Sequence, residues 1–477
     1  MTRRRSSISA SRSLWSFRIV PLAAAILAAA FWTVAIWALV KIPSTNAADL
    51  PAATRQILKD LELDASALKD IDRALALPKA MVEGARKEGA VKVGSSVDAK
   101  RFLEMVKPFR ERYPFIRIDY ARGNRFTRVI QPLIALQAGR VTTDVIAALG
   151  NQYDALKKTG TLADLRGLPA YRGLDPEMKG PGGLWAGQGM LLRCMAYNTS
   201  LVKPGEVPKT WEDLITNPRW RGAKIGMPNR PDAWALHLWA AKGEAWTKNF
   251  LTRLFTEVKP SLRKEGSNAV LGLMVAGEFD AVLAGSTRRG RQYVAKKAPF
   301  AMVCPEIVAV GLSDVAVIKI SPRYNAAMVY ANWLLSREGQ LAQYARTGYG
   351  PTYADLREKG LLPLAEITKG RKFVIGNYDL QSKYGEPLSK FWNELWYKGT
   401  GLKMRTVTAE ITAAERGGRR YRFMADGKEV TVRVSSSRTA IVVDGKRQGR
   451  KAVKKGMRCE VTYPGNDQEA MKVACDR

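Results

Sequence analysis

Polar and basic residues follow several strand-like segments of the 477-residue sequence, and their chemistry suits the binding of an anion. Ser286, Thr287 and Arg288 come directly after EFDAVLAG, while Arg230 and Asp232 follow AKIGMP. Hydroxyl and guanidinium groups bind carboxylate, phosphonate or phosphate oxygens through charge-assisted hydrogen bonds. An arginine in a loop is more often a solvated surface charge. The elements that position these residues must therefore decide between the two interpretations.

The same placement selects further polar residues. Ser95 and Ser96 end the segment AVKVGSS, where they serve either as ligand groups or as a plain helix N-cap. Asn151 follows TDVIAALG and could be only a turn former, and Tyr349 is the weakest candidate. The predicted ligand-binding set is therefore Ser95, Ser96, Asn151, Asn229, Arg230, Asp232, Ser286, Thr287, Arg288 and Tyr349.

The sequence offers few residues suited to catalysis or to metal binding. His237 is the single histidine, which argues against a Ser–His or Cys–His hydrolase and against a histidine-based metal site. The sequence has no P-loop, and none of the four cysteines has CxxC spacing. His237 lies within the helical segment PDAWALHLWAAKG, and we interpret it as a packing or surface residue. We expect no enzyme, no cofactor and no metal site.

Strand and helix patterns alternate from residue 90 onward. AVKVGSS, FIRIDY and TDVIAAL have strand character, and helical segments separate them, one of which Pro108 should kink. This alternation predicts an α/β fold with a parallel sheet covered by helices. In such open sheets a ligand lies beyond the carboxyl ends of the strands, beside helix N-termini that attract anions. The predicted ligand-binding set follows strand ends of this kind.

The pattern of apolar and polar residues changes near residue 404. Residues 404–477 contain short alternating runs separated by Asp–Gly turns at 426–427 and 444–445, which predicts hairpins in a small β-barrel of OB-like type. Residues 50–89 have helical character instead. The length of the chain fits about three domains.

The large excess of basic over acidic residues does not by itself identify a binding partner. The formal net charge is +33, but the basic residues are dispersed and no run outside the N-terminus exceeds two. Nucleic-acid binders of the OB type expose aromatic rings for stacking, and residues 404–477 offer only Tyr421, Phe423 and Tyr463. We therefore expect no nucleic acid partner and favour an adhesion or envelope-contact role for this domain.

The N-terminus predicts export. Arginines between Arg3 and Arg18 precede an uncharged apolar stretch, Ile19–Val40, and small residues follow near Ala48. Residues 1–48 are therefore either a cleaved signal peptide or a transmembrane anchor, and both alternatives stay open. A helical spacer over 49–82 would follow. The predicted location is periplasmic, with the membrane as a further partner if the segment is uncleaved.

The cysteines agree with an oxidising location. Cys459 and Cys475 lie on the apolar faces of two predicted neighbouring strands, so we predict a disulfide between them. Closing a loop of this length stabilises a protein by about 3 kcal/mol in the chain-entropy model. Pairing of Cys194 with Cys304 stays open.

Several strings together resemble one family. They are KEGAVKVGSS, FRERYPFIRIDY, AYNTSLV, PKTWEDLITNPRWRGAKIGMPN, GSNAVLGLMVAGEFDAVLAG and NAAMVYANWLLSREGQLAQYARTGYGP. Over residues 83–397 the chain resembles a periplasmic solute-binding protein of an ABC transporter, of the type II, ferric-iron-binding-protein-like branch. The resemblance implies two α/β lobes that close on a ligand about a hinge. Lobe 1 would take residues 83–193 and 306–397, and lobe 2 residues 194–305.

The resemblance also implies a function. The chain would capture a small solute and deliver it to an ABC permease; the alternative is a membrane-tethered sensor or envelope assembly component on the same fold. Ferric-binding relatives place adjacent tyrosines after the strand that ends at Gly285, because phenolates suit a hard trivalent cation. This sequence has Ser286 to Arg289 there, without a tyrosine pair. We therefore expect an anionic small molecule, or a chelate that carries an anion.

Overall fold

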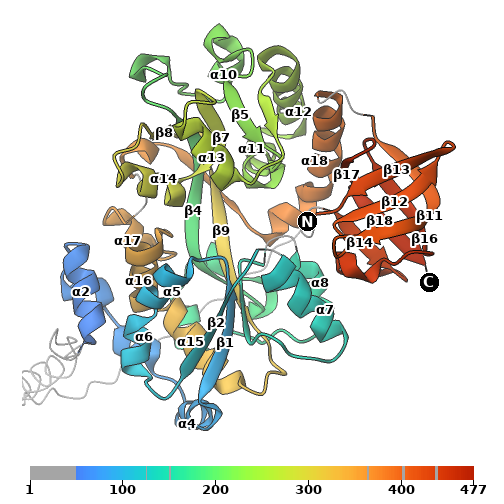
Figure 1. The fold of residues 1–477 in the computed structure, drawn as a ribbon. Helices are drawn as coiled ribbons and strands as arrows, with labels where there is room; N and C mark the ends of the chain where they lie inside the picture. Colours follow the sequence, from blue (N-terminus) through green and yellow to red (C-terminus); the bar gives the residue numbers. More distant parts are fainter. Residues whose placement is uncertain are drawn as a thin grey trace, which may run out of the picture. The chain divides into compact units, whose positions relative to one another are not determined.

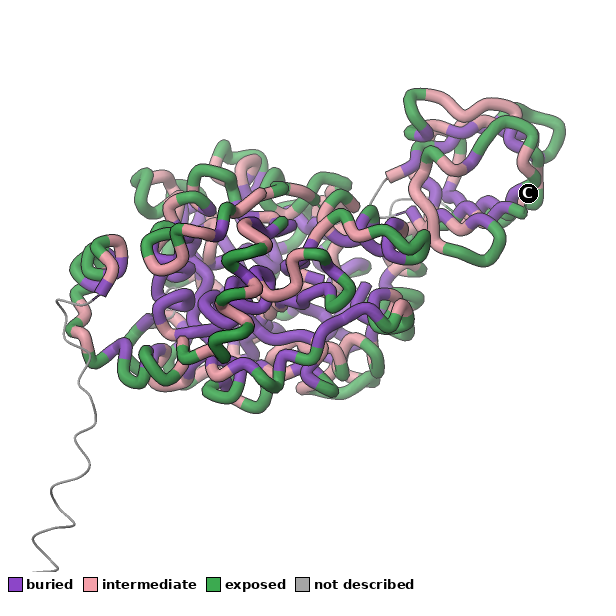
Figure 2. Tube along the Cα trace, turned by 90° about the horizontal axis from the view of Figure 1, so that it is seen from below, coloured by how far each residue is buried: buried purple, intermediate pink, exposed green. Residues whose placement is uncertain are grey.

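The computed structural model describes residues 50–124, 126–149, 152–361, 365–399, 403–435 and 439–476. The predicted signal or anchor at 1–48 lies outside the described residues. Within the described ranges, no helix combines the length and the apolar character needed to cross a bilayer. Residues 50–399 form an α/β body and residues 403–476 a separate β domain, and in both of them the buried residues gather in the interior (Figure 2). The predicted fold class, α/β with a small all-β domain, is confirmed.

Lobe 1 is built on three parallel strands at one end of a ten-stranded sheet. β1 (Ala90–Ser95) pairs with β2 (Arg117–Arg122) and with β3 (Val145–Ala147). The expected kink at Pro108 is confirmed, because this proline occupies the first turn of a separate helix. The helices of lobe 1 are α5 (Ala99–Met105), α6 (Lys107–Arg112), α7 (Gln131–Gln137), α8 (Tyr153–Lys157), α9 (Pro169–Arg172), α15 (Tyr324–Leu335), α16 (Arg337–Thr347) and α17 (Ala354–Glu358).

Two long strands connect the lobes (Figure 1). β4 (Ala186–Tyr197) and β9 (Ile307–Val317) are antiparallel neighbours in the middle of the sheet, whose order is β2-β1-β3-β9-β4-β7-β5-β6. β9 pairs with β3 of lobe 1, whereas β4 pairs with β7 of lobe 2. The two lobes therefore share one continuous sheet, and β4 and β9 are the elements about which they can hinge.

Lobe 2 repeats the α/β arrangement. β5 (Ile225–Pro228) is parallel to β6 (Ser261–Arg263) and to β7 (Ala281–Ser286). The edge strands β8 (Ala301–Val303) and β10 (Lys372–Gly376) pair with β4 and β9. The helices are α10 (Asp213–Thr216), α11 (Ala235–Lys242), α12 (Glu244–Arg253), α13 (Ser267–Val275), α14 (Thr287–Val294) and α18 (Tyr378–Gly399).

The last helix of the body corrects one expected boundary. The resemblance assigned residues 306–397 to lobe 1, but Trp392 and Trp396 of α18 lie in the same hydrophobic core as Trp211 and Trp234 of lobe 2. The ring centroids of Trp234 and Trp392 are 6.0 Å apart. Residues 378–397 therefore pack with lobe 2, because the large indole rings of α18 fill the core there.

The segment expected as a helical spacer packs against lobe 1. It contains α2 (Ala52–Asp60), α3 (Ile71–Leu75) and α4 (Lys79–Glu88). The Thr54 hydroxyl donates a hydrogen bond of 2.5 Å to Glu338 of α16, a residue that is 1% exposed. Arg112 donates two hydrogen bonds to the same carboxylate, at 2.7 and 3.0 Å, and the Trp333 indole donates one at 2.8 Å. One buried carboxylate thus holds α2, α6 and α15 together.

The β domain is a single eight-stranded sheet. β11 bends at a bulge after Ile411, so that it pairs with β16 along its first half and with β12 along its second, as strands of small barrels do. Tyr421, Phe423 and Tyr463 are buried in its core, so none of these three rings can stack on a nucleotide base. The strands are β11 (Arg405–Glu415), β12 (Arg420–Ala425), β13 (Lys428–Arg433), β14 (Ala440–Val443), β15 (Lys446–Arg447), β16 (Arg458–Tyr463), β17 (Gln468–Glu469) and β18 (Lys472–Asp476).

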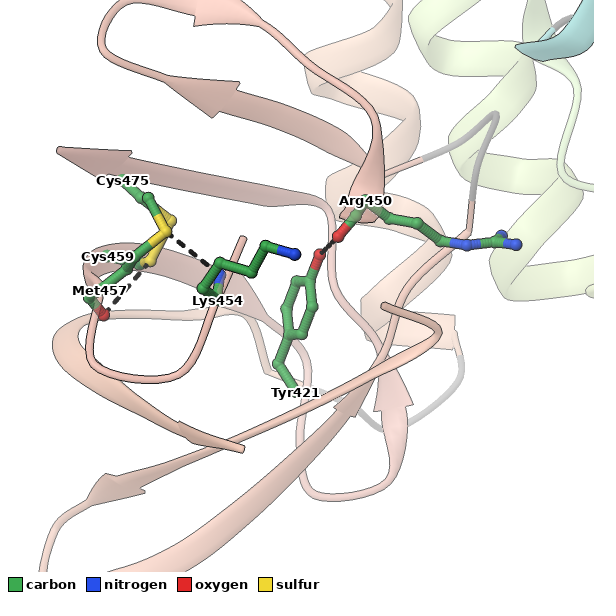
Figure 3. Close-up of a disulfide and its surroundings, with 6 residues drawn as sticks. All are labelled: Tyr421, Arg450, Lys454, Met457, Cys459 and Cys475. Atoms are coloured by element: carbon green, nitrogen blue, oxygen red, sulfur yellow. Dashed lines mark hydrogen bonds between the residues drawn. A yellow bond between two sulfur atoms is a disulfide. The ribbon is translucent and has the colours of Figure 1, made fainter. Parts of the chain in front are cut away.

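Both cysteine pairs form disulfides. Cys459 and Cys475 are direct partners in the β16–β18 ladder and are bonded, which confirms the prediction (Figure 3). Nearby, the Tyr421 hydroxyl donates to the carbonyl oxygen of Arg450. Cys194 of β4 is bonded to Cys304, which follows β8, and this settles the pairing that the sequence left open.

Candidate ligand-binding cleft

A cavity of about 650 Å³, here called the cleft, opens where the strands of both lobes end. Residues that follow β1, β3, β5, β6 and β7 line it, as the rule for open α/β sheets predicts. Six members of the predicted set line the cleft: Ser96, Arg230, Asp232, Ser286, Arg288 and Tyr349. Strand-end reasoning therefore selected loops of both lobes that open onto this cavity, and their binding of a ligand stays a prediction.

Three predicted residues do not line the cleft. Thr287 is buried, and its hydroxyl accepts a hydrogen bond of 3.2 Å from the backbone N–H of Leu192. The side-chain oxygen of Asn229 accepts from the Trp392 indole at 2.8 Å, and the Ser95 hydroxyl accepts from the backbone of Val97. Successive residues of an extended chain point to opposite sides, so only some residues of each strand end can face a ligand. A fourth, Asn151, lies outside the described residues.

Two arginines that the sequence analysis did not select also line the cleft, and Arg193 is the more informative of them. It lies in β4 and is partly buried, and within the described ranges its guanidinium has no hydrogen bond and no carboxylate in salt-bridge distance. Burial, with a smaller contribution from the like charge of Arg230, lowers its pKa to about 10, so it remains a cation at neutral pH. The signal that could have found it is a charged residue inside the apolar strand LLRCMAY.

Arg128 lies in the π-helical turn Phe126–Ile130 and is tied to the backbone of lobe 1. Its guanidinium donates to the carbonyl oxygens of Ala147 at 3.1 Å and Ala148 at 3.0 Å. Burial lowers its pKa, although the charges that Tyr349 and Asp314 carry when ionised oppose this shift. These bonds fix the guanidinium beside the end of β3.

The remaining two arginines differ in their partners. Arg230 pairs with Asp232 at 3.3 Å, and the charge of this carboxylate raises the pKa of Arg230. Within the described ranges Arg288 has no carboxylate partner, and its guanidinium lies 4.9 Å from the centre of the Tyr349 ring. The cleft is thus lined by four arginines, Arg128, Arg193, Arg230 and Arg288.

The pKa of Tyr349 reflects the positive potential that these arginines create. Burial by itself would raise the pKa of this phenol. The Arg288 charge, a hydrogen bond with Ser313, the Arg128 charge and a hydrogen bond with Ser96 outweigh burial, so the pKa of Tyr349 is lowered. The groups that favour a phenolate would favour a bound anion for the same reason.

Two helix N-termini add to this potential. Gly266, Ser267 and Asn268 at the start of α13 line the cleft, as do Ser286 and Arg288 at the start of α14. The hydroxyl of Ser286 makes no capping hydrogen bond to α14. Unpaired N–H groups at a helix start carry partial positive charge and bind anions.

The cleft also contains acidic and neutral titratable groups. Burial raises the pKa of Asp314 to about 6, although the backbone N–H of Leu149 donates to its carboxylate at 2.7 Å. His237 is buried, and burial lowers its pKa to about 4, so its ring is neutral at pH 7. Its Nε2 lies 3.2 Å from the Val310 carbonyl oxygen and donates to it. The interpretation of His237 as a packing residue fits this burial, but the ring also lines the cleft.

Aromatic side chains form another part of the cleft wall. Tyr153, Trp185 and Tyr378, called the aromatic group below, all line it. The Tyr153 ring makes edge contacts with Tyr378, at 4.5 Å between centroids, and with Trp185, at 6.4 Å. The Tyr378 hydroxyl donates to Asp154, which fixes its ring. Within the described ranges, no group of three or more His, Cys, Asp or Glu side chains is placed to hold a metal ion.

Comparison with known proteins agrees with this architecture. The model of a family described as bacterial extracellular solute-binding protein matches residues 104–369, which is more than half of the chain. The chain belongs to this family. Iron uptake protein A1 of Synechocystis sp. is 27% identical to this solute-binding protein over 185 residues, which are 35% of this chain and 49% of the relative. The match thus spans only about half the length of that relative.

Solved structures show the same fold. Iron-bound HitA from Pseudomonas aeruginosa is similar with a TM-score of 0.52 and 20% identity, over 64% of this solute-binding protein and 99% of HitA. The Trichodesmium protein IdiA (FutA), solved in complex with iron and citrate, gives a TM-score of 0.52 and 19% identity, over 64% and 99% of the two chains. At this level of identity the likeness establishes the two-lobed periplasmic-binding-protein architecture.

Proposed function

We propose that this protein captures a small anionic solute in the cleft, outside the cytoplasmic membrane, and delivers it to an ABC permease. The observation that carries the proposal is Arg193, a partly buried cation in the cleft wall that has no carboxylate within salt-bridge distance among the described residues. A buried charge is costly unless it is paired. An anionic ligand would supply the missing partner, and Arg230, Arg288 and Ser286 lie at the same cavity.

Calorimetry tests this proposal. The purified protein is titrated with acetate, methylphosphonate, phosphate and ferric citrate, and we expect binding of at least one oxyanion. Arg193→Ala should weaken that binding by about tenfold to a hundredfold, which corresponds to one lost charge-assisted hydrogen bond. Lys296→Ala is the matched control, because Lys296 is exposed in the same lobe and does not line the cleft. Binding of ferric ion without any response to the anions would contradict the proposal.

A second candidate ligand is a ferric chelate that carries an anion. Tyr349 favours it, because its lowered pKa promotes the phenolate form that suits a hard cation. The titration with ferric citrate should then produce a visible charge-transfer band, and Tyr349→Phe should abolish it. A band that survives in this variant would exclude Tyr349 as an iron ligand.

A membrane-tethered sensor or assembly component on the same fold is the other functional class. The apolar stretch Ile19–Val40 favours it, since this stretch is long enough to span a bilayer. Mass spectrometry of the protein from its native envelope distinguishes the two classes. A mature N-terminus near Ala48 supports a released transport protein, and an intact Met1 supports the tether.

A further inference from the structure

We propose that the ligand is a ring-bearing organic oxyanion, whose anionic head binds Arg193 and Arg288 and whose ring packs against Tyr153, Trp185 and Tyr378. This inference rests on the proposed function, which requires only that the ligand be an anion. It adds an aromatic ring to the anionic group, and the two together define the chemical class of the ligand.

The cleft is large enough for an organic ligand. Its volume is about 650 Å³, whereas one molecule of liquid water occupies about 30 Å³. The volume of the cleft is thus on the order of twenty times that of one water molecule. An inorganic tetrahedral anion or a metal ion needs far less space. Cavities of roughly 300–1,000 Å³ are typical of sites for larger organic ligands.

The cationic and aromatic parts of the wall are distinct neighbourhoods. The titratable groups that act on Arg193 are Arg230, Asp232, Tyr349 and Arg288. Those that act on Tyr153 are instead Tyr378, Asp154 and Asp379. One ligand that uses the whole cleft would place its anionic group in the first neighbourhood, away from Asp154 and Asp379, and its ring against the aromatic side chains of the second.

The aromatic part of the wall contains two unsatisfied hydrogen-bond donors. The Tyr153 hydroxyl and the Trp185 indole N–H are buried and have no hydrogen-bond partner among the described residues. A buried donor without a partner lowers stability, so such groups are rare unless something binds them. Both side chains belong to the wall of the cleft. Neither donor atom is exposed in this structure, so an acceptor on the ring of the ligand would satisfy them only after these side chains turn toward the cleft.

Matched pairs of probes test the inference. Methylphosphonate and phenylphosphonate share one anionic head, and acetate and benzoate share another, so each pair isolates the contribution of the ring. In calorimetry with the full chain, we expect the ring-bearing member of the pair that binds to have about tenfold higher affinity. Equal affinity within that pair would overturn the inference and leave the proposed function standing. No binding of any anion would instead overturn the proposed function, and this inference with it.

Variants then locate the ring. Tyr378→Ala should remove most of the affinity difference within the pair that binds without weakening its ring-free member, and Tyr378→Phe should retain the difference because it retains the ring. Tyr384→Ala is the control on the same helix, since Tyr384 does not line the cleft. If Tyr378→Ala weakened both probes equally, the ring would lie elsewhere and the inference would be wrong.

Discussion

Arg193 of β4 and Ser286 of β7 are direct partners across an antiparallel ladder, and both line the cleft. Arg193 is also paired with Ala309 of β9, so it lies where β4 passes from one neighbour to the other. Paired residues of neighbouring strands project to the same face of a sheet. A guanidinium and a hydroxyl are therefore presented together at the strands that join the lobes.

The pairing of Arg193 with Ser286 predicts that their contributions to ligand binding are coupled. Arg193→Lys keeps the positive charge but loses the planar fork of donors, so we expect anion affinity to fall about tenfold. Ser286→Ala should weaken binding by a smaller factor. In a double-mutant cycle measured by calorimetry, the combined effect should be less than the sum of the two single effects, because both groups bind one head group. Additive effects would show that the two residues act on different parts of the ligand.

Asp314 should make stability depend on pH. Its folded pKa of about 6 lies above the ordinary 3.8, so the favourable contribution of its protonated form is complete below pH 3.8 and lost as pH rises through 6. Asp314→Asn should therefore stabilise the protein above pH 6, by at most about 3 kcal/mol, and change little at pH 4. Urea unfolding at the two pH values measures this, with Asp379→Asn on the surface as the control.

The same group should affect binding. A charged Asp314 in the cleft wall repels an anionic ligand, so affinity for benzenesulfonate, which stays a monoanion, should rise as pH falls through 6. Asp314→Asn should flatten this profile at the higher affinity. An unchanged profile in the variant would assign the pH dependence to another group.

The two disulfides should have separable effects. Cys194–Cys304 spans 110 residues of sequence and begins beside Arg193, whereas Cys459–Cys475 spans 16 residues within the β domain. Replacing Cys194 and Cys304 by Ala should lower the stability of the body by about 2–5 kcal/mol and weaken anion binding. Replacing Cys459 and Cys475 should destabilise the β domain and leave binding unchanged. Calorimetry and thermal unfolding of both double variants test this; equal loss of affinity in the two would contradict it.

Glu338 should be important for stability and not for binding. Glu338→Gln leaves Arg112 without its carboxylate in a buried network that also includes Thr54 and Trp333. Removing one partner of a buried pair typically costs about 3–5 kcal/mol. Glu104→Gln, which breaks the surface pair with Lys107, should change the midpoint of urea unfolding very little. A large change in anion affinity for Glu338→Gln would contradict a purely structural role.

Local patterns in the sequence were sufficient for much of the architecture. The period of the apolar residues predicts the strands and helices, the alternation around Cys459 and Cys475 predicts their disulfide, and the polar residues after AKIGMP and EFDAVLAG mark two loops of the cleft. These features depend on residues near one another in the chain, and local geometry is enough to infer them. The lobe assignment of α18 was missed because its partner indoles lie more than 150 residues away in the sequence.

The sequence by itself determined the fold class, the positions of the strand ends and the excess of positive charge. Only the tertiary structure decided which strand-end residues face the cleft, since Thr287 points into the core while its neighbours Ser286 and Arg288 do not. It alone brought in Arg193, Arg128 and the aromatic group, because β4 and β9 cross between lobes and bring distant segments to one cavity. Burial at that cavity then set the pKa of Arg193, Asp314 and His237, which no pattern of residues along a chain can specify.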